Sequence, residues 1–339
     1  MSTPHDGPGP APGSDTPASH ARDLPVVERT VRRRGPARVI RVVALLLVVL
    51  VVAAPLVVLA LLPRQEVTGL APAGATFNML LVGSDSREGL SEAERRELTT
   101  GSAGGERSDT IMLMTVQGTR VGLLSFPRDL SVERCDGSVG RINGAVAIGG
   151  PGCLVDTVER LSGIDIHHHV TVTFGGFRDV VDAVGGVELC LERAIRDRSA
   201  GIDLPEGCQV LDGADALGYV RVRKIDSDFA RIERQQQFLR ALARELLDPT
   251  LVVRPWRLVA ITSGVSRALT VDQRLGPVDL LRLALGLRLL AGGGAVTATV
   301  PSDGFTSSSG AALQRVRQPD ADALFAGFAD GSALRPPEE

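Results

Sequence analysis

An uncharged run of 21 residues, Val42–Leu62, constrains this 339-residue chain more than any other feature. A helix needs about 20 apolar residues to cross a hydrocarbon core of roughly 30 Å, so the run predicts one membrane span, which Pro55 would kink. The run starts too far along the chain, and is too long, to be the apolar part of a cleaved signal peptide. Residues 39–62 are therefore predicted to form an uncleaved transmembrane signal-anchor helix.

Charges on either side of this run predict its orientation. Arginines are frequent before the run, whereas Arg64 is the only one that follows at once. Cytoplasmic flanks carry the excess of positive charge, so the N-terminus is predicted to lie in the cytoplasm and everything after residue 63 outside the cell. We expect a single-pass protein of the cell membrane, with the lipid bilayer as a partner and its folded domain extracellular.

The rest of the chain divides by composition. Pro, Gly, Ser and Thr dominate residues 1–38, which cannot bury enough apolar surface to fold and are predicted to be a disordered cytoplasmic tail. Residues 63–76 are predicted to be a juxtamembrane linker, residues 77–329 a single folded catalytic domain, and residues 330–339 a flexible tail.

The cysteine positions agree with an extracellular address. All four lie after the apolar run, as two neighbouring pairs that are each 18 residues apart, and no CxxC pair suggests zinc. Four cysteines allow three connectivities, of which we favour two local loops, Cys135 with Cys153 and Cys190 with Cys208. Their predicted role is structural.

Hydrophobic periodicity favours an α/β fold, with a central sheet sandwiched by helices. Strands are predicted over residues 77–82, 110–116, 121–126, 168–174, 187–191, 217–222 and 295–300. Helices are predicted over residues 144–161, 174–184, 232–247 and 277–290.

Charged residues gather at the ends of the first three predicted strands, where α/β sheets usually bind ligands. Asp85 follows the first strand and Asp109 precedes the second. Mg²⁺ takes one or two carboxylates together with water and phosphate oxygens, so these two residues are predicted metal ligands, for Mg²⁺ or for Mn²⁺ in its place. Arg87, Arg107 and Arg128, beside the same strand ends, would face the phosphates of a substrate.

A second group of arginines lies between Tyr219 and Phe238. If residues 217–223 form a strand, Arg221 and Arg223 project from one face of it. Asp228 is predicted to cap the following helix, on which Arg231 and Gln235 are four residues apart and share a face. Because guanidinium groups bind phosphate oxygens two at a time, the segment predicts a phosphate site.

The motifs together resemble the LytR-CpsA-Psr family. They are GSDSR at 83–87, RSDT at 107–110, FPRD at 126–129, RING at 141–144, VVDAVGGVE at 180–188 and RVRKIDSDFARIERQQQF at 221–238. The resemblance implies an α/β/α sandwich around a central mixed sheet, with an apolar tunnel for a lipid tail. It implies a phosphotransferase that moves a glycopolymer from a polyprenyl pyrophosphate carrier onto peptidoglycan through a phosphodiester bond.

The resemblance also implies roles for individual residues. Asp85 and Asp109 match its metal-binding carboxylates. The pyrophosphate-binding positions match Arg87, Arg128, Arg223, Arg231 and Gln235, to which the residue patterns add Arg107 and Arg221. We assign catalytic roles to Arg87, Arg128, Asp228 and Arg231, with Asp228 as the hypothetical carboxylate that relays the acceptor proton.

Several other functions are disfavoured. The net charge of −3, the few aromatic residues and the extracellular address argue against nucleic-acid binding. His167, His168 and His169 would alternate between the faces of a strand, so they cannot grip one metal ion together. Two alternatives stay open, a phosphatase or pyrophosphatase acting on the lipid carrier, and a non-catalytic envelope regulator that binds anionic wall polymer.

Overall fold

A computed structural model describes residues 40–41, 53, 56–84, 108–222 and 228–335. The chain divides into two units, Met1–Leu45 and Leu46–Glu339. Almost all described residues belong to the second unit, and the fold described below is that of this unit alone.

The longest strands of this unit belong to one mixed sheet. Its strands among the described residues are β1 (Arg64–Gln65), β2 (Thr76–Ser84), β3 (Ser108–Gln117), β4 (Arg120–Phe126), β7 (His168–Thr173), β12 (Leu269–Asp272) and β13 (Ala295–Thr299). Their order across the sheet is β1-β12-β7-β2-β3-β4-β13. The remaining strands form hairpin-like pairs and are β5 (Ser131–Glu133), β6 (Val139–Arg141), β8 (Val187–Leu191), β9 (Ile195–Asp197), β10 (Ile202–Leu204), β11 (Gly207–Leu211), β14 (Ser302–Thr306) and β15 (Ala312–Val316).

Strand directions define two edges of this sheet. β7 is parallel to β2, β4 is related to β2 through two antiparallel pairings, and β13 is parallel to β4. The first residues of these four strands therefore lie at one end of the sheet, which we call the basal edge. Their last residues lie at the opposite end, which we call the pocket edge. β12 is antiparallel to β7 and ends at the basal edge.

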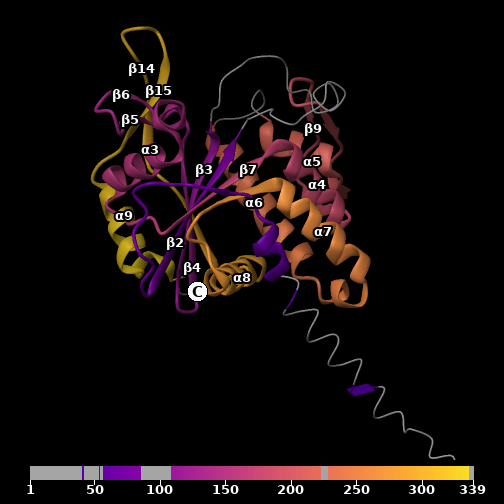
Figure 1. The fold of residues 1–339 in the computed structure, drawn as a ribbon. Coiled ribbons are helices and arrows are strands. Elements are labelled where there is room, and N and C mark those ends of the chain that lie inside the picture. The colour runs from indigo at the N-terminus through magenta and orange to yellow at the C-terminus, as the bar shows by residue number, and fades with distance from the viewer. Residues whose placement is uncertain (1–39, 42–52, 54–55, 85–107, 223–227, 336–339) are drawn as a thin grey trace, which may run out of the picture. The chain divides into compact units, whose positions relative to one another are not determined.

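Helices cover both faces of the sheet (Figure 1). They are α3 (Ala145–Ser162), α4 (Phe174–Val184), α5 (Gly213–Arg221), α6 (Asp228–Leu246), α7 (Pro255–Ala268), α8 (Pro277–Ala291) and α9 (Asp320–Asp330). Short 3-10 helices are η1 (Ile142–Gly144), η2 (Pro249–Val253) and η3 (Ser332–Leu334).

Alternation along the central strands separates the core into two layers. In β2, Leu80 and Val82 pack with α3 and α9, whereas Phe77 and Met79 pack with α6 and α8 on the opposite face. The same alternation continues in β3 and β4, because successive side chains of a strand point to opposite faces. The mixed central sheet with flanking helices confirms the predicted α/β class.

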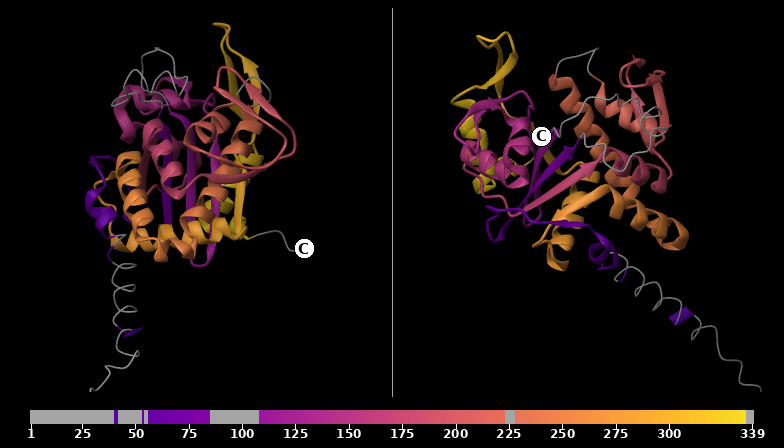
Figure 2. Two further views of the ribbon diagram at one scale, coloured as in Figure 1. Left: turned by 90° about the vertical axis from the view of Figure 1, so that its right-hand side faces the viewer. Right: turned by 45° about the horizontal axis from the view of Figure 1, so that its top comes forward.

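A third core lies beside the sheet and joins α4, α5, α6 and α7 to the small strands β8–β11. Here α4 and α7 cross closely at Gly176, where a Cβ atom would overlap the backbone of Ala268. This core matters for the site because it holds α5 and α6 side by side (Figure 2).

Both predicted disulfides are present. Cys135–Cys153 joins the segment after β5 to α3, and Cys190–Cys208 joins residues that are directly paired between β8 and β11. No free cysteine occurs in the described part of the chain. Each bridge therefore fastens a peripheral element, as expected for a structural role.

The folded unit extends beyond the predicted range of 77–329 at both ends. Within the predicted linker, 63–76, β1 joins the sheet through its pairing with β12, and Val67 and Leu70 are buried in the core. At the other end, η3 contributes the fully buried side chain of Leu334. The predicted tail 1–38 and residues 336–339 lie outside the described residues.

Of the predicted membrane span, the structure describes mainly the end, residues 56–62. Residues 56–61 are helical, and Leu59 and Leu62 are buried against the sheet and α8. Among the described residues no helix is both long and apolar enough to cross a membrane. Most of Val42–Leu62 falls outside these residues.

One strand prediction is wrong. Residues 217–222, predicted as a strand, belong mostly to α5. The side chain of Asp212 accepts hydrogen bonds from the backbone amides of Ala214 and Asp215, which caps the helix and fixes its start. Arg221 is thus presented from the last turn of a helix and not from a strand.

Candidate active site

The pocket edge brings together the ends of several elements that are distant in sequence. β2 ends at Ser84, β7 ends at Thr173 and leads directly into α4, and α6 begins at Asp228. Thr173 caps α4, because its side chain accepts a hydrogen bond from the Gly176 amide at 3.3 Å. The N-terminal turns of two helices therefore lie beside the ends of parallel strands, an arrangement that suits an anion.

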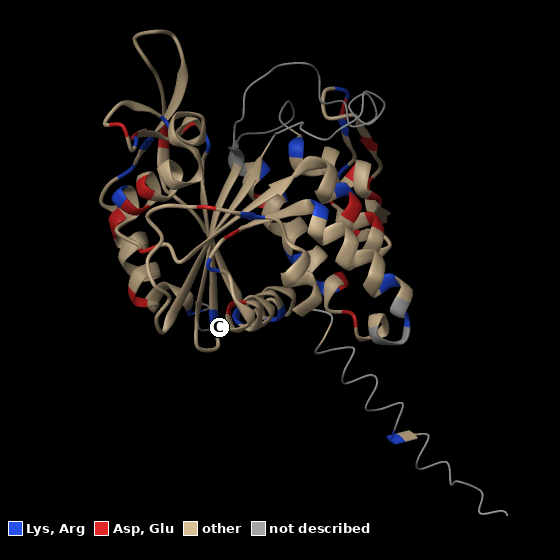
Figure 3. Ribbon diagram, viewed as in Figure 1, with Lys and Arg blue, Asp and Glu red and all other residues tan. Residues whose placement is uncertain are grey.

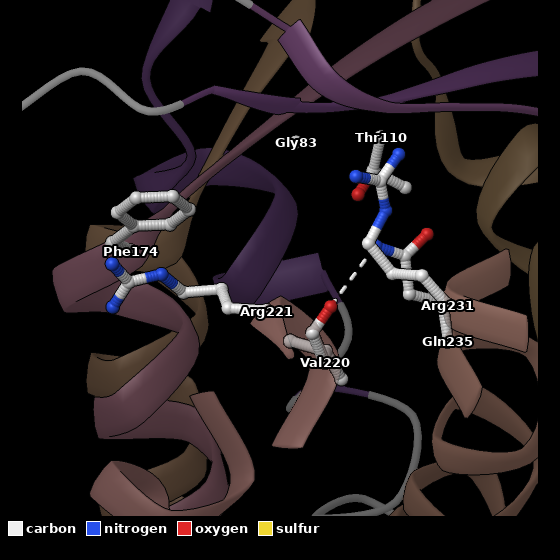
Figure 4. Close-up of a pocket in the computed structure, with 7 residues that line it drawn as sticks. All are labelled: Gly83, Thr110, Phe174, Val220, Arg221, Arg231 and Gln235. Atoms are coloured by element: carbon white, nitrogen blue, oxygen red, sulfur yellow. Dashed lines mark hydrogen bonds between the residues drawn. The ribbon is translucent and has the colours of Figure 1, made fainter. Parts of the chain in front are cut away.

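A solvent-open pocket of about 330 Å³ occupies this edge. Its described lining consists of Gly83, Thr110, Phe174, Val220, Arg221, Arg231 and Gln235 (Figure 4). Two of these residues are cationic and none is acidic, so the lining favours a negatively charged ligand.

Arg221 and Arg231 enter the pocket from different helices. The guanidinium of Arg221 lies over the ring of Phe174, 5.3 Å from its centroid, at the end of α5. Arg231 comes from the first turn of α6 and is only 3% exposed. Because the charge of Arg231 is withdrawn from bulk water, its attraction for an anion in the pocket is stronger than it would be at the surface.

Three consecutive glutamines fix the position of α6. Gln235 donates from Nε2 to the Val220 carbonyl at 3.2 Å, which ties the helix to the pocket wall. Gln236 donates from Nε2 to Ser125 Oγ of β4 at 3.0 Å, and Gln237 accepts from the Tyr219 hydroxyl at 2.9 Å. The register of Arg231 and Gln235 toward the pocket is thus held by hydrogen bonds on three sides of the helix.

Arg234 belongs to this framework and not to the surface. Arg234 is 8% exposed and donates from Nη2 to the Val222 carbonyl at 3.0 Å. Arg240 is half-buried and donates to Thr297 Oγ1 of β13 at 2.7 Å. Both arginines connect α6 to its neighbours.

Three of the predicted binding residues are therefore brought together, namely Arg221, Arg231 and Gln235. Asp85, Arg87, Arg107 and Arg223 lie outside the described residues. For Asp109 and Asp228 only the backbone is described, as part of β3 and as the first residue of α6.

The backbone around Asp109 is irregular. Gly83 is paired with Thr110, but Ser84 is paired with Ser108, so Asp109 is the extra residue of a β-bulge. Bulges often redirect a side chain next to an active site. In the sequence Asp85 follows Ser84 directly, which puts both predicted metal ligands next to this one bulge.

Arg128 lies at the same edge but does not line the pocket within the described chain. Its Nε is 3.2 Å from Asp129 Oδ2, and Arg141 Nε is 2.9 Å from Asp129 Oδ1. Two arginines thus flank one carboxylate beyond the end of β4.

The three histidines do not converge, as the alternation predicted. His167 Nδ1 accepts from the Asn78 amide, His168 Nδ1 lies 3.0 Å from Asp272 Oδ2, and His169 Nδ1 lies 3.2 Å from Gln65 Nε2. Across the described ranges no group of three or more His, Cys, Asp or Glu side chains could hold a metal ion. These histidines belong to the basal edge, far along β7 from the pocket.

Sequence reasoning missed the apolar part of the lining. Phe174 and Val220 were not proposed as site residues, yet they shape the pocket and orient Arg221. One signal was available, since Phe174 directly follows a strand that ends at the predicted ligand edge. Gly83 also lines the pocket, and a Cβ atom there would lie 3.1 Å from Thr110 Cβ.

Comparison with known proteins identifies a family for this chain. The model of the LytR_cpsA_psr family matches residues 64–327. The probable cell wall biosynthesis protein LcpB of Corynebacterium glutamicum is 39% identical over 254 residues, which cover 74% of this chain and 60% of LcpB. The polyisoprenyl-teichoic acid–peptidoglycan teichoic acid transferase TagU of Halalkalibacterium halodurans is 34% identical, over 62% of this chain and 66% of TagU.

A solved structure shows the same fold. The LytR-Csp2A-Psr enzyme from Actinomyces oris superposes with a TM-score of 0.62 at 20% identity, covering 79% of this chain and 96% of the other. The chain spans somewhat less than two thirds of the length of the curated relatives named above.

Proposed function

We propose, on the premise that this chain belongs to the LytR-CpsA-Psr family, that it is a phosphotransferase of cell wall biogenesis. It moves a glycopolymer from a polyprenyl pyrophosphate carrier onto peptidoglycan and forms a phosphodiester bond. The observation that carries the proposal is the pocket that Arg221 lines from α5 and that Arg231 and Gln235 line from α6. The names of the relatives, cell wall biosynthesis protein and teichoic acid transferase, support the same class of reaction.

In this proposal the pocket binds the pyrophosphate. Arg231 and Gln235 contact it from α6 and Arg221 from α5, and the guanidinium groups bind phosphate oxygens in pairs. Arg87, Arg107 and Arg223 add to this set, and Arg128 supplies positive charge at the end of β4.

Asp85 and Asp109 are the residues that would hold Mg²⁺, or Mn²⁺. Two carboxylates are a donor set that suits Mg²⁺, and both residues are next to the bulge opposite Gly83. When bound, the ion would neutralise charge on the pyrophosphate oxygens.

The reaction needs positioning and charge neutralisation more than covalent catalysis. The acceptor hydroxyl of peptidoglycan, for which we propose the muramic acid 6-hydroxyl, attacks the phosphorus next to the glycopolymer. A new phosphorus–oxygen bond forms while the bond to the bridging oxygen breaks, and polyprenyl phosphate leaves with that electron pair. Asp228 takes the proton of the acceptor, and Arg87, Arg128 and Arg231 stabilise the leaving group.

Location is part of the same proposal. The run Val42–Leu62 would anchor the protein in the cell membrane, with the N-terminus in the cytoplasm and the pocket outside, where lipid-linked polymer and peptidoglycan meet.

A single assay tests the reaction. The full chain is incubated with a polyprenyl pyrophosphate-linked oligosaccharide, Mg²⁺ and peptidoglycan oligomers, and the products are identified by mass spectrometry. The proposal expects an oligosaccharide joined to peptidoglycan through phosphate. Release of oligosaccharide phosphate and polyprenyl phosphate without a joined product would instead identify a phosphatase or pyrophosphatase, and binding without turnover would identify a regulator.

A further inference from the structure

The basal edge exposes apolar side chains that the pocket does not need. The helix α8 connects the end of β12 to the start of β13, and both of these strand ends lie at the basal edge. The helix therefore crosses one face of the sheet near its basal edge, and Figure 2 shows it across the base of the strands.

α8 is apolar on almost every side. Its inner face, which includes Leu283, Leu287 and Leu290, packs on the sheet. Its outer face exposes Val278 by 64% and Leu281 by 72%, three residues apart on one stripe. The charged residues of the helix are Asp279, Arg282 and Arg288 (Figure 3). A helix that is apolar all round is normally covered on all sides.

Neighbouring helices expose apolar residues at the same edge. α4 leads away from the pocket edge, and the first turn of α7 lies beside its far end, where Arg257 Nη1 donates to the Val184 carbonyl at 3.4 Å. In that turn Trp256 is 67% exposed and Val259 is 70% exposed. Helix 56–61, which lies between α7 and α8 in Figures 1 and 2, exposes Leu56, Val57 and Leu61. We call these seven exposed residues the basal patch.

We propose that the basal patch docks in the interface of the lipid bilayer, so that α8 and the start of α7 lie in the membrane surface. This inference rests on the membrane anchoring of the proposed function. The apolar run ends at Leu62, β1 begins at Arg64, and the end of the run, helix 56–61, itself packs on the sheet and α8 through Leu59. The basal edge must therefore lie close to the surface of any bilayer in which the rest of this run is inserted.

The composition of the basal patch fits an interface. Trp is enriched at the depth of the lipid headgroups because its ring is apolar and its N–H is polar. Arg254, just before α7, and Arg288, on the outer face of α8, are exposed and would meet lipid phosphates. Docking would orient the pocket edge away from the bilayer, at a distance from the membrane surface of about one strand length.

The chain provides its own probe, since Trp256 is its only tryptophan. The full chain is reconstituted in vesicles of phosphatidylcholine and phosphatidylglycerol, with and without acyl-chain bromine, and its emission is recorded. Docking predicts that bromolipid removes most of the Trp256 emission while aqueous acrylamide removes little. The double variant Val278→Glu, Leu281→Glu should reverse this pattern. The matched control Val139→Glu, at a residue of β6 that is 73% exposed, should leave it unchanged.

Flotation of the same vesicles separates anchoring from docking. A chain that floats but leaves Trp256 open to acrylamide would overturn docking and leave the anchor intact. Protection from both quenchers, with cross-links between chains at α8, would assign the basal patch to a second copy and also overturn docking. A chain that does not float would overturn the anchor and docking together. Because both substituted positions are largely exposed, thermal unfolding of the double variant should match the wild type.

Discussion

The two edges of the central sheet distribute charge in opposite ways. At the pocket edge, arginines surround a cavity that opens to solvent, and the apolar residues Phe174 and Val220 support them. At the basal edge, the side chains of His168 and Asp272 form a hydrogen-bonded pair that is almost completely buried, while tryptophan and aliphatic side chains face outward. The pocket edge presents cationic side chains to a ligand, whereas the side chains of the basal network bind one another within the protein. The pocket edge should therefore govern activity and the basal edge stability.

The largest effect is expected from breaking the basal network. Asp272 is fully buried and accepts hydrogen bonds from the His169 amide at 3.1 Å and the Arg274 amide at 2.8 Å, besides its contact with His168. Burial alone would raise the pKa of Asp272, but these partners hold the pKa below its usual value. Asp272→Ala should cost about 3–5 kcal/mol in the free energy of unfolding, because it strands a buried partner.

Chemical denaturation of Asp272→Ala beside Asp203→Ala measures this cost. Asp203 pairs with Arg196 at the surface, where both side chains are more than half exposed, so its removal should cost less than about 1 kcal/mol. The folded fraction of Asp272→Ala should keep its transfer activity at low temperature. Equal losses of unfolding free energy in the two variants would contradict the idea that the basal edge governs stability. Lost activity in the folded fraction of Asp272→Ala would contradict the idea that the pocket edge alone governs activity.

The next effect concerns the pocket edge. Arg231→Ala removes a nearly buried cation from the proposed pyrophosphate site, and kcat/KM should fall by about 100-fold or more, as for other preorganised donors. The unfolding midpoint should change little. The matched control is Arg244→Ala, on the last turn of the same helix, where Nε donates to the Ala291 carbonyl near the basal edge. An equal fall in kcat/KM in both variants would show that Arg231 does not belong to the binding site.

The sequence predicted the sheet well because its central strands are buried on both faces. Residues 77–82, 110–116 and 121–126 all lie within observed strands, since short, nearly continuous apolar runs can be recognised without tertiary information. α5 was mistaken for a strand because Leu217, Tyr219, Val220 and Val222 have high β propensity. The cap at Asp212, together with burial against β10 and α6, outweighed that preference.

The sequence predicted the polar residues of the pocket but not its apolar wall. Arg221, Arg231 and Gln235 could be proposed as phosphate-binding residues from their side-chain chemistry alone. Phe174 reaches the pocket only because β7 lies beside β2, a pairing between residues about 90 positions apart that periodicity cannot reveal. The burial of Arg234 follows from the carbonyl of Val222, which α5 brings within reach.

A pH titration should sharpen the contrast between the edges. Burial lowers the pKa of His169 to about 4, an effect that Asp272 only partly opposes. Because this pKa lies below its value of about 6.5 in the unfolded chain, the unfolded state binds more protons between pH 6.5 and 4. Neutral His169 therefore contributes stability that is fully present above pH 6.5 and is lost as the pH falls toward 4.

The loss amounts to about 3 kcal/mol at one histidine, since each pKa unit corresponds to roughly 1.4 kcal/mol. His167, whose pKa burial also lowers, acts in the same direction. Denaturant unfolding of the wild type and of His169→Gln across this range measures the effect. The variant should show a flatter dependence on pH, and parallel curves would mean that His169 does not titrate on unfolding.

The smallest predicted effect tests the helix that spans both edges. α6 begins at the pocket edge and ends beside α8, and Gln236 ties its middle to Ser125 of β4. Gln236→Leu should cost about 1 kcal/mol in the free energy of unfolding, the net value of a typical hydrogen bond. The exposed Glu233 of the same helix offers the control Glu233→Ala, which should be nearly neutral.

Gln236→Leu should also change the kinetics of transfer. In this variant Arg231 and Gln235 are displaced equally in the ground state and the transition state, so KM should rise while kcat stays constant. A fall in kcat with KM unchanged would instead mean that the position of α6 is set during the reaction, and the two edges would not be independent.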